Sequence, residues 1–167
     1  NVKYRGKDKD FQFEKGCELV LYNIDAIMHE EECIIVEGEP DTLAYVESGI
    51  LNVASVPNGF TLPRKDGTST INLNFLDNYY SFFENKKKIY IAVDNDEAGR
   101  HGQKELIIRF GADKCWIVDF KDCKDANDYL KKYGPESLRK TIEEAKQVPL
   151  EWVETMPDFE KDLDNFY

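Results

Sequence analysis

The chain has 167 residues, of which 41% are hydrophobic and 13% aromatic, enough for one ordinary core and a small additional lobe. It carries 33 acidic and 22 basic residues, a formal charge of −11. This balance argues against a broad basic surface that grips a nucleic-acid backbone. Nearly half of the excess lies in residues 151–167, which hold six acids and one base. A carboxylate cluster that binds metal would account for part of the remainder.

The four cysteines, Cys17, Cys33, Cys115 and Cys123, form no Cys-x-x-Cys pair, and only two histidines could join them as ligands. We therefore expect no zinc site in this chain. Cys33 and Cys115 lie in or beside apolar runs, which is typical of core thiols. The sequence shows no signal peptide and no run of about 20 apolar residues. We expect a reduced, cytoplasmic protein without a membrane partner.

The first 30 residues read as the end of a preceding lobe. Residues 1–9 are polar and basic, 11–13 alternate as a short strand would, and 18–22 predict a second strand before a helix over 23–30.

An alternating pattern begins at Cys33. It predicts strands at 33–36, 51–55, 89–93 and 115–118, and helices at 40–48, 74–85, 98–110, 126–132 and 135–146. Gly111 follows the third helix as a C-terminal cap would. Strands separated by helices imply right-handed crossovers, so we expect an α/β fold with a sheet of about four mainly parallel strands.

Two acidic turns follow strands of this pattern. Glu37 comes directly after the first strand, and Asp94 and Asp96 follow the strand at 89–93. The carboxyl ends of parallel strands share one crevice, so these carboxylates should converge there. Side chains two residues apart on an extended chain point the same way. Such a pair suits Mg²⁺, which prefers oxygen ligands and is commonly held by one or two carboxylates plus substrate phosphates.

Three acidic motifs occur in order along the chain, at residues 36–41 (Val-Glu-Gly-Glu-Pro-Asp), 94–99 (Asp-x-Asp-x-Ala-Gly) and 124–128 (Lys-Asp-Ala-Asn-Asp). Together they resemble the motifs of the Toprim domain, in the form found in the primase-helicases of bacteriophages, relatives of the mitochondrial Twinkle helicase, and more distantly in bacterial DNA primases. The loop Ser-Val-Pro-Asn-Gly at 55–59 and the basic strand Val-Lys-Tyr-Arg at 2–5 also match that group. The resemblance covers about residues 1–148.

The resemblance implies a Toprim fold and an enzyme that joins nucleotides with Mg²⁺, for which Mn²⁺ can substitute. By position, Glu37 matches the family's general acid/base, Asp94 and Asp96 its metal-binding pair, and Asp125 the first acid of the third motif. Where bacterial primases have a second acid, Asn127 stands here, and the adjacent Asp128 is a candidate ligand. Glu37 is a further candidate ligand.

Each assignment has a structural alternative. Asp94 or Asp96 could cap the helix that begins near Ala98, and Glu37 could be a solvated turn residue. The other acids of the first motif, Glu39 and Asp41, are interpreted as helix-start charges.

Candidates for nucleotide or phosphate binding lie outside the acidic motifs; they are Lys3, Arg5, Asn58, Gly59 and Arg100. The alternatives are a solvated basic strand for the first two, a structural turn for the next two, and an ion pair with Glu97 for Arg100.

The leading hypothesis is therefore a DNA primase module that makes RNA primers on single-stranded DNA from ribonucleoside triphosphates. Its domains would be the end of an N-terminal primase subdomain (1–30), the catalytic Toprim domain (31–148) and an acidic linker (149–167) toward a replicative helicase. The linker would be a tether, although its aromatic residues could dock as a short helix. A helicase motor motif and a zinc-binding template-reading module are absent from this sequence and would be fused or associated partners. A phage source would place the protein in the host cytoplasm or nucleoid.

Two alternatives stay open: a non-catalytic nucleic-acid-binding module of a helicase, and a Toprim nuclease or topoisomerase.

Overall fold

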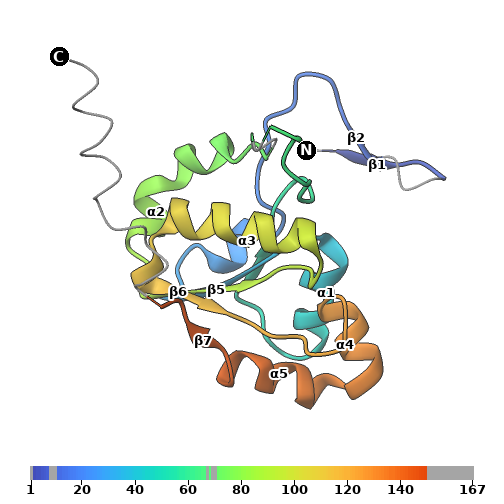
Figure 1. The fold of residues 1–167 in the computed structure, drawn as a ribbon, viewed down its shortest axis with the longest axis vertical. Helices are drawn as coiled ribbons and strands as arrows, with labels where there is room; N and C mark the ends of the chain where they lie inside the picture. The colour runs from blue at the N-terminus through green and yellow to red at the C-terminus, as the bar shows by residue number, and fades with distance from the viewer. Residues whose placement is uncertain (1, 8–10, 67, 69–70, 150–167) are drawn as a thin grey trace.

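The computed structural model describes residues 2–7, 11–66, 68 and 71–149, and it has the α/β architecture predicted from the sequence (Figure 1). A five-stranded sheet with the order β4-β3-β5-β6-β7 forms its centre. The strands are β3 (Glu32–Val36), β4 (Val53–Ser55), β5 (Lys88–Ala92), β6 (Cys115–Ile117) and β7 (Lys146–Gln147). The first four pair in parallel, and β7 runs antiparallel to β6.

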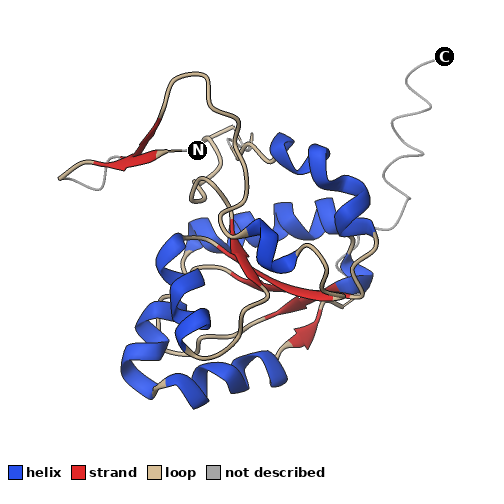
Figure 2. Cartoon of the chain, turned by 180° about the vertical axis from the view of Figure 1, so that it is seen from behind, coloured by secondary structure: helices blue, strands red, loops and turns tan. Residues whose placement is uncertain are grey.

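Helices cover both faces of the sheet (Figure 2). One face carries η1 (Ile24–Ile27), η2 (Asn74–Tyr79), α2 (Tyr80–Glu84) and α3 (Glu97–Phe110), and η3 (Ala112–Lys114) joins α3 to β6. The opposite face carries α1 (Glu39–Glu47), α4 (Ala126–Tyr133) and α5 (Pro135–Glu143).

The strands are apolar throughout because both faces are buried. In β3, Cys33 and Ile35 pack beneath α3, while Ile34 and Val36 pack beneath α1 and α4. All four side chains are at most 1% exposed. Burying each Ile or Val contributes about 1.5–3 kcal/mol relative to an exposed position, which makes β3 a principal anchor of the sheet.

The expectation of about four strands was one strand short. The helix predicted over 135–146 ends at Glu143, and Lys146 and Gln147 instead pair with Ile117 and Trp116 as β7. This two-residue strand is exposed and polar, so it covers the edge of β6 without offering a long apolar edge of its own. A strand this short has no periodicity that could have predicted it.

The segment before β3 is less regular than predicted. Residues 18–22 form no strand, only an isolated bridge between Tyr22 and Ser55, and the helix expected over 23–30 is the single 3-10 turn η1. Asn23 has φ +62, a left-handed conformation that cannot continue a helix. The helix predicted over 74–85 begins as the 3-10 segment η2, consistent with the low helix propensity of its aromatic and Asn residues.

The N-terminal residues form a hairpin set apart from the main sheet (Figure 1). β1 (Lys3–Arg5) pairs antiparallel with β2 (Phe11–Phe13). Lys3 ties the hairpin to the first acidic motif, since its ammonium lies 2.8 Å from Glu39 Oε1 and 2.9 Å from the carbonyl oxygen of Pro57. The acidic segment predicted to be a linker lies, apart from Pro149, outside the described residues. Within the part that the structure describes, none of the helices is long and apolar enough to cross a bilayer.

Two glycines let α3 lie close to its neighbours. A Cβ on Gly99 would be 2.0 Å from the carbonyl oxygen of Asp94, and a Cβ on Gly102 would be 2.1 Å from Cγ of Phe60. Phe60, 8% exposed, therefore packs its ring directly on the backbone of the second turn of α3.

This contact makes Gly102→Ala informative, because alanine favours a helix interior by about 1 kcal/mol while overpacking costs about 1–3 kcal/mol. We expect the substitution to lower the free energy of unfolding, measured by urea denaturation. In a Phe60→Ala background, which removes the ring, the same change should be neutral or stabilising. An equal loss in both backgrounds would contradict the proposed contact.

Candidate active site

The parallel pairing of β3 with β5 brings the first two acidic motifs to one edge of the sheet. Val36 is paired with Ala92, so the residues that follow each strand emerge side by side. Glu37 follows β3 directly, and Asp94 follows β5 after Val93. The convergence predicted from the sequence is therefore present in the fold.

Glu37 is held by the loop after β4. Its Oε1 accepts a hydrogen bond of 3.0 Å from the backbone N–H of Phe60, while its Oε2 is buried with no hydrogen-bond partner among the described residues. Burial and then the charge of Asp94 raise the pKa of Glu37 to about 7, against the opposing effects of the Phe60 N–H and of the nearby backbone N–H of Asp94. Gly59 passes so close that a Cβ there would lie 3.1 Å from Oε1. The Asn58-Gly59 loop thus positions the carboxylate, and the side chain of Asn58 is exposed.

Asp94 and Asp96 point toward a common cation. The ammonium of Lys124 lies 2.8 Å from Asp94 Oδ2 and 3.6 Å from Asp96 Oδ2. Asp96 also caps α3, because its Oδ1 accepts from the N–H of Gly99 at 2.9 Å. Burial raises the pKa of Asp94 above its ordinary value, although the hydrogen bond from Lys124 opposes the shift. The capping interpretation therefore holds for Asp96 and leaves its second oxygen facing the site.

The third motif begins α4. Asp125 is the N-cap of this helix and accepts from the N–H of Asp128 at 2.8 Å. The carboxylate of Asp128 is exposed and lies 3.6 Å from the ammonium of Lys131, one turn further along α4. The charge of Asp125 raises the pKa of both Asp41 and Asp94, so Asp125 belongs to the acidic cluster. Asp128 instead lies in a surface ion pair.

Asp41 belongs to the cluster, although sequence reasoning placed it among helix-start charges. It is 7% exposed, and its Oδ1 accepts from the backbone N–H of Asn127 at 3.2 Å, joining the first motif to the third. Burial and then the charge of Asp125 raise its pKa to about 7, with smaller effects in the same direction from Asp94 and Glu37. Its position in the first turn of α1 is as expected, but the packing of α1 on α4 that buries it is a tertiary contact that no local pattern shows.

Asn95 joins the second motif to the third through the backbone. Its N–H donates to the carbonyl oxygen of Lys124 at 2.6 Å, and its side-chain amide donates to that of Lys121 at 3.0 Å. Lys121 adopts φ +55, a left-handed conformation within this turn. These bonds hold the loop that carries Lys124 and Asp125 against Asp94 and Asp96.

Two of the predicted phosphate-binding residues, Lys3 and Arg100, lie at the rim of the cluster. Lys3 contacts the first motif through Glu39, and Arg5 belongs to β1 with its side chain outside the described part of the chain. Arg100, the fourth residue of α3, donates to Asn95 Oδ1 at 3.5 Å rather than showing the alternative pair with Glu97. Arg100 and Asp94 line a cavity of about 640 Å³ at the carboxyl ends of β5 and β6.

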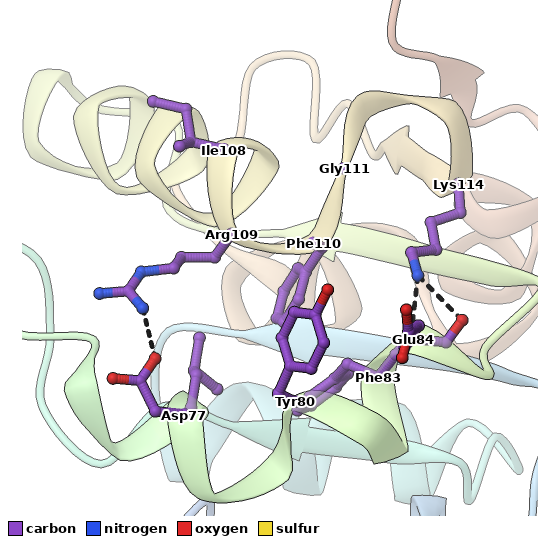
Figure 3. A pocket seen from close by; sticks show the side chains of 10 residues that line it. Asp77, Tyr80, Phe83, Glu84, Ile108, Arg109, Phe110, Gly111 and Lys114 are labelled. Atoms are coloured by element: carbon purple, nitrogen blue, oxygen red, sulfur yellow. Dashed lines mark hydrogen bonds and ion pairs between the residues drawn. The ribbon is translucent and has the colours of Figure 1, made fainter.

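A second cavity, of about 510 Å³, lies at the other end of α3 and contains none of the motif residues (Figure 3). Its walls are tied together by Arg109, which is ion-paired with Asp77 at 2.5 Å, and by Lys114, which donates to the carbonyl oxygens of Phe83 and Glu84. These contacts hold η2 against α3 and α2 against η3, and we interpret this cavity as part of the packing of that face.

The donor set of the acidic cluster fits a hard divalent cation. Two carboxylates already converge on a positive charge, and a third carboxylate oxygen, Glu37 Oε2, is buried without a partner within the described ranges. No group of three or more His, Cys, Asp or Glu among the described residues is arranged to hold a metal ion by itself. The arrangement is that of a partial oxygen site, which ligands from a substrate would complete.

Comparisons with known proteins agree with this geometry. The model of the Toprim-like family matches residues 34–130, the span that contains all three motifs. The Twinkle homolog protein, chloroplastic/mitochondrial, of Arabidopsis thaliana is 36% identical over 180 residues, covering 100% of this chain and 25% of that protein. The primase homolog protein of the same plant is 36% identical over 161 residues, covering 90% of this chain and 48% of that protein. This chain therefore spans between a quarter and about half of these relatives.

Solved structures show the same fold. The primase fragment of the bacteriophage T7 primase-helicase protein has a TM-score of 0.67 at 23% identity, over 84% of this chain and 56% of that one. The Aquifex aeolicus primase, with its zinc-binding and RNA polymerase domains, has a TM-score of 0.57 at 24% identity, over 90% of this chain and 35% of that one. The chain belongs to the Toprim-like family and is a primase-type domain related to primase-helicase proteins.

Proposed function

We propose that this chain is the catalytic Toprim domain of a DNA primase, which joins ribonucleoside triphosphates into RNA primers on single-stranded DNA with Mg²⁺ as cofactor. The observation that carries the proposal is the convergence of Glu37, Asp94 and Asp96 at one edge of the sheet, with Glu37 Oε2 buried and unpaired in the described structure. The match to primase-type relatives supports the same reading.

In this reaction the 3′-hydroxyl of one nucleotide attacks the α-phosphorus of the next. A new O–P bond forms, the bond to pyrophosphate breaks, and the hydroxyl proton must be accepted. Glu37 would accept it, because a carboxyl whose pKa is raised to about 7 can exchange a proton near neutral pH.

Asp94 and Asp96 would hold the cation, and Asp125 would add negative charge beside them. A bound divalent cation would supply neutralisation of the pyrophosphate leaving group and acidification of the hydroxyl. Lys3 and Arg100, at the rim, would contact triphosphate oxygens. Template, helicase and zinc-binding module would be partners, as the partial coverage of the larger relatives suggests.

A non-catalytic nucleic-acid-binding module is the second candidate. It is favoured by the ion pair that Lys124 makes with Asp94 at 2.8 Å, which neutralises a carboxylate that catalysis would need. A Toprim nuclease or topoisomerase is the remaining class.

One assay separates these classes: labelled ribonucleotides and single-stranded DNA are incubated with the chain and, where it occurs within a longer polypeptide, with that polypeptide. The proposal expects short RNA products that require Mg²⁺. DNA binding without products would favour the binding module, and cleavage of the DNA would favour the nuclease or topoisomerase class.

In that assay, Glu37→Gln removes the charge and the proton acceptor at nearly constant shape. Primer formation should fall at least about a hundredfold, the lower range for a general acid/base, while DNA binding persists. Asp77→Asn, a charge change at the far end of α3, is the control and should leave the yield unchanged. Near-normal synthesis by Glu37→Gln would demote Glu37 to a structural residue.

Metal binding is tested without activity. Titration calorimetry with Mn²⁺ should show weak binding by the chain and loss of that binding in Asp94→Asn, with unchanged circular dichroism. Asp128→Asn, which removes an acid held in a surface ion pair, should bind normally. Binding that survives Asp94→Asn would rule out this pair as the site.

The acidic cluster also predicts how stability depends on pH. The pKa of Asp41 rises from its ordinary 3.8 to about 7 on folding, and that of Glu37 from 4.5 to about 7. Folding therefore favours their protonated forms, so their contribution is present below about pH 4 and is lost as the pH rises to about 7. Without metal, the melting temperature should be higher at pH 5 than at pH 7.5.

Asp41→Asn keeps an acceptor for the N–H of Asn127 but removes the charge. It should raise the melting temperature at pH 7.5 by a few degrees, and by a smaller amount at pH 5. A lower melting temperature at pH 7.5 would show that the ionised form of Asp41 is required by the fold.

A further inference from the structure

Lys124 is a positive charge built into the acidic cluster. Its ammonium contacts both Asp94 and Asp96, the two carboxylates that the proposed function assigns to a divalent cation. An ammonium is a compact positive charge that donates hydrogen bonds and has no lone pair to offer a metal ion. Lys124 therefore neutralises the same two carboxylates that a cation would, but it cannot itself be a ligand of a bound metal ion.

The backbone of Lys124 is fixed, whereas its side chain has room to move. Its carbonyl oxygen accepts a hydrogen bond of 2.6 Å from the N–H of Asn95. This bond holds the backbone of Lys124 next to the turn that carries the two carboxylates. The Lys124 side chain is 55% exposed, and those of Asp94 and Asp96 are 13% and 44% exposed. The ammonium can thus rotate into solvent without disturbing the core.

The charges around the cluster explain why this contact forms. Asp94 is largely buried beside Asp96 and Asp125, and its hydrogen bond to Lys124 is the chief cause that raises the pKa of the lysine above its ordinary value. Lys124 is an ammonium at neutral pH, as lysine side chains ordinarily are. Without a metal, it offsets part of the repulsion among the acids.

We propose that Lys124 is a displaceable counter-ion of Asp94 and Asp96. Its ammonium must leave both carboxylates before a divalent cation binds there, and this competition lowers the metal affinity of the domain. The inference rests on the proposed metal site. It makes Lys124 a positioning residue: it presets the two carboxylates toward a common point and keeps the site from binding metal tightly before substrate arrives.

The test is the affinity of the chain for Mn²⁺ alone, measured by titration calorimetry. Lys124→Met removes the competing charge, so affinity should rise about two- to fivefold, the upper part of the range for an ion pair at a partly exposed position. Lys124→Arg keeps the charge and should bind no more tightly than the wild type. Melting curves report whether each variant is folded, and Lys124→Gln replaces the Met variant if that one is not.

Lys121→Met is the matched control. Lys121 lies in the same loop and is ion-paired with Glu144 at 3.4 Å, so its removal changes the net charge equally without freeing Asp94. Its Mn²⁺ affinity should stay within about twofold of the wild type. An equal rise in Lys121→Met and Lys124→Met would reduce the effect to general electrostatics and overturn the proposal.

A second background distinguishes this inference from the proposed function. Asp94→Asn combined with Lys124→Met should abolish the tighter binding. Unchanged or weaker affinity in Lys124→Met, with binding still lost in Asp94→Asn, would overturn the counter-ion role and leave the metal site intact. Absence of Mn²⁺ binding in the wild type and in Lys124→Met alike would overturn both.

Discussion

The parallel register between β3 and β5 is the constraint on which the site depends. Pairing of Val36 with Ala92 sends Glu37 and the Asp94–Asp96 turn out of the same edge. Because both strands are buried on both faces, a slip of one residue would exchange the faces of Ile34 and Ile35, and each would have to pack among side chains that fit the other. The hydrophobic core thus fixes the relative positions of acids that repel each other.

That repulsion is countered locally by donors rather than by a broad basic surface. Backbone N–H groups of Phe60, Gly99 and Asn127 each donate to one of the acids, and Lys124 supplies a full positive charge. One oxygen, Oε2 of Glu37, stays buried without a partner among the described residues. Burying an unpaired carboxylate oxygen costs folding free energy. Buried polar atoms without partners are typical of functional sites.

The sequence predicts the features that depend on local pattern. The four parallel strands, the helix predicted over 98–110 with Gly111 at its end, which is Glu97–Phe110 in the structure, and the acids at the strand ends all follow from periodicity, turn residues and motif spacing. β7 was missed, and the helix predicted over 23–30 is only the 3-10 turn at Ile24–Ile27, because such short elements are set by tertiary packing. Asp41 and Lys124 were missed as members of the cluster for a related reason. Their neighbours lie 86 and 30 residues away, at Asn127 and Asp94, so only the folded chain reveals the contacts.

Helix α3 links the two halves of the site mechanically. Its first turn is capped by Asp96, and the backbone of its second turn supports the ring of Phe60, whose N–H holds Glu37. The first two turns of this one helix therefore fix the distance between Glu37, the proposed acid/base, and Asp94 and Asp96, the proposed metal ligands. The long connection from Thr61 to Leu73 leaves this frame only after Phe60 is anchored. Residues 61–66 of that connection are exposed, so their sequence can change without altering the geometry of the carboxylates.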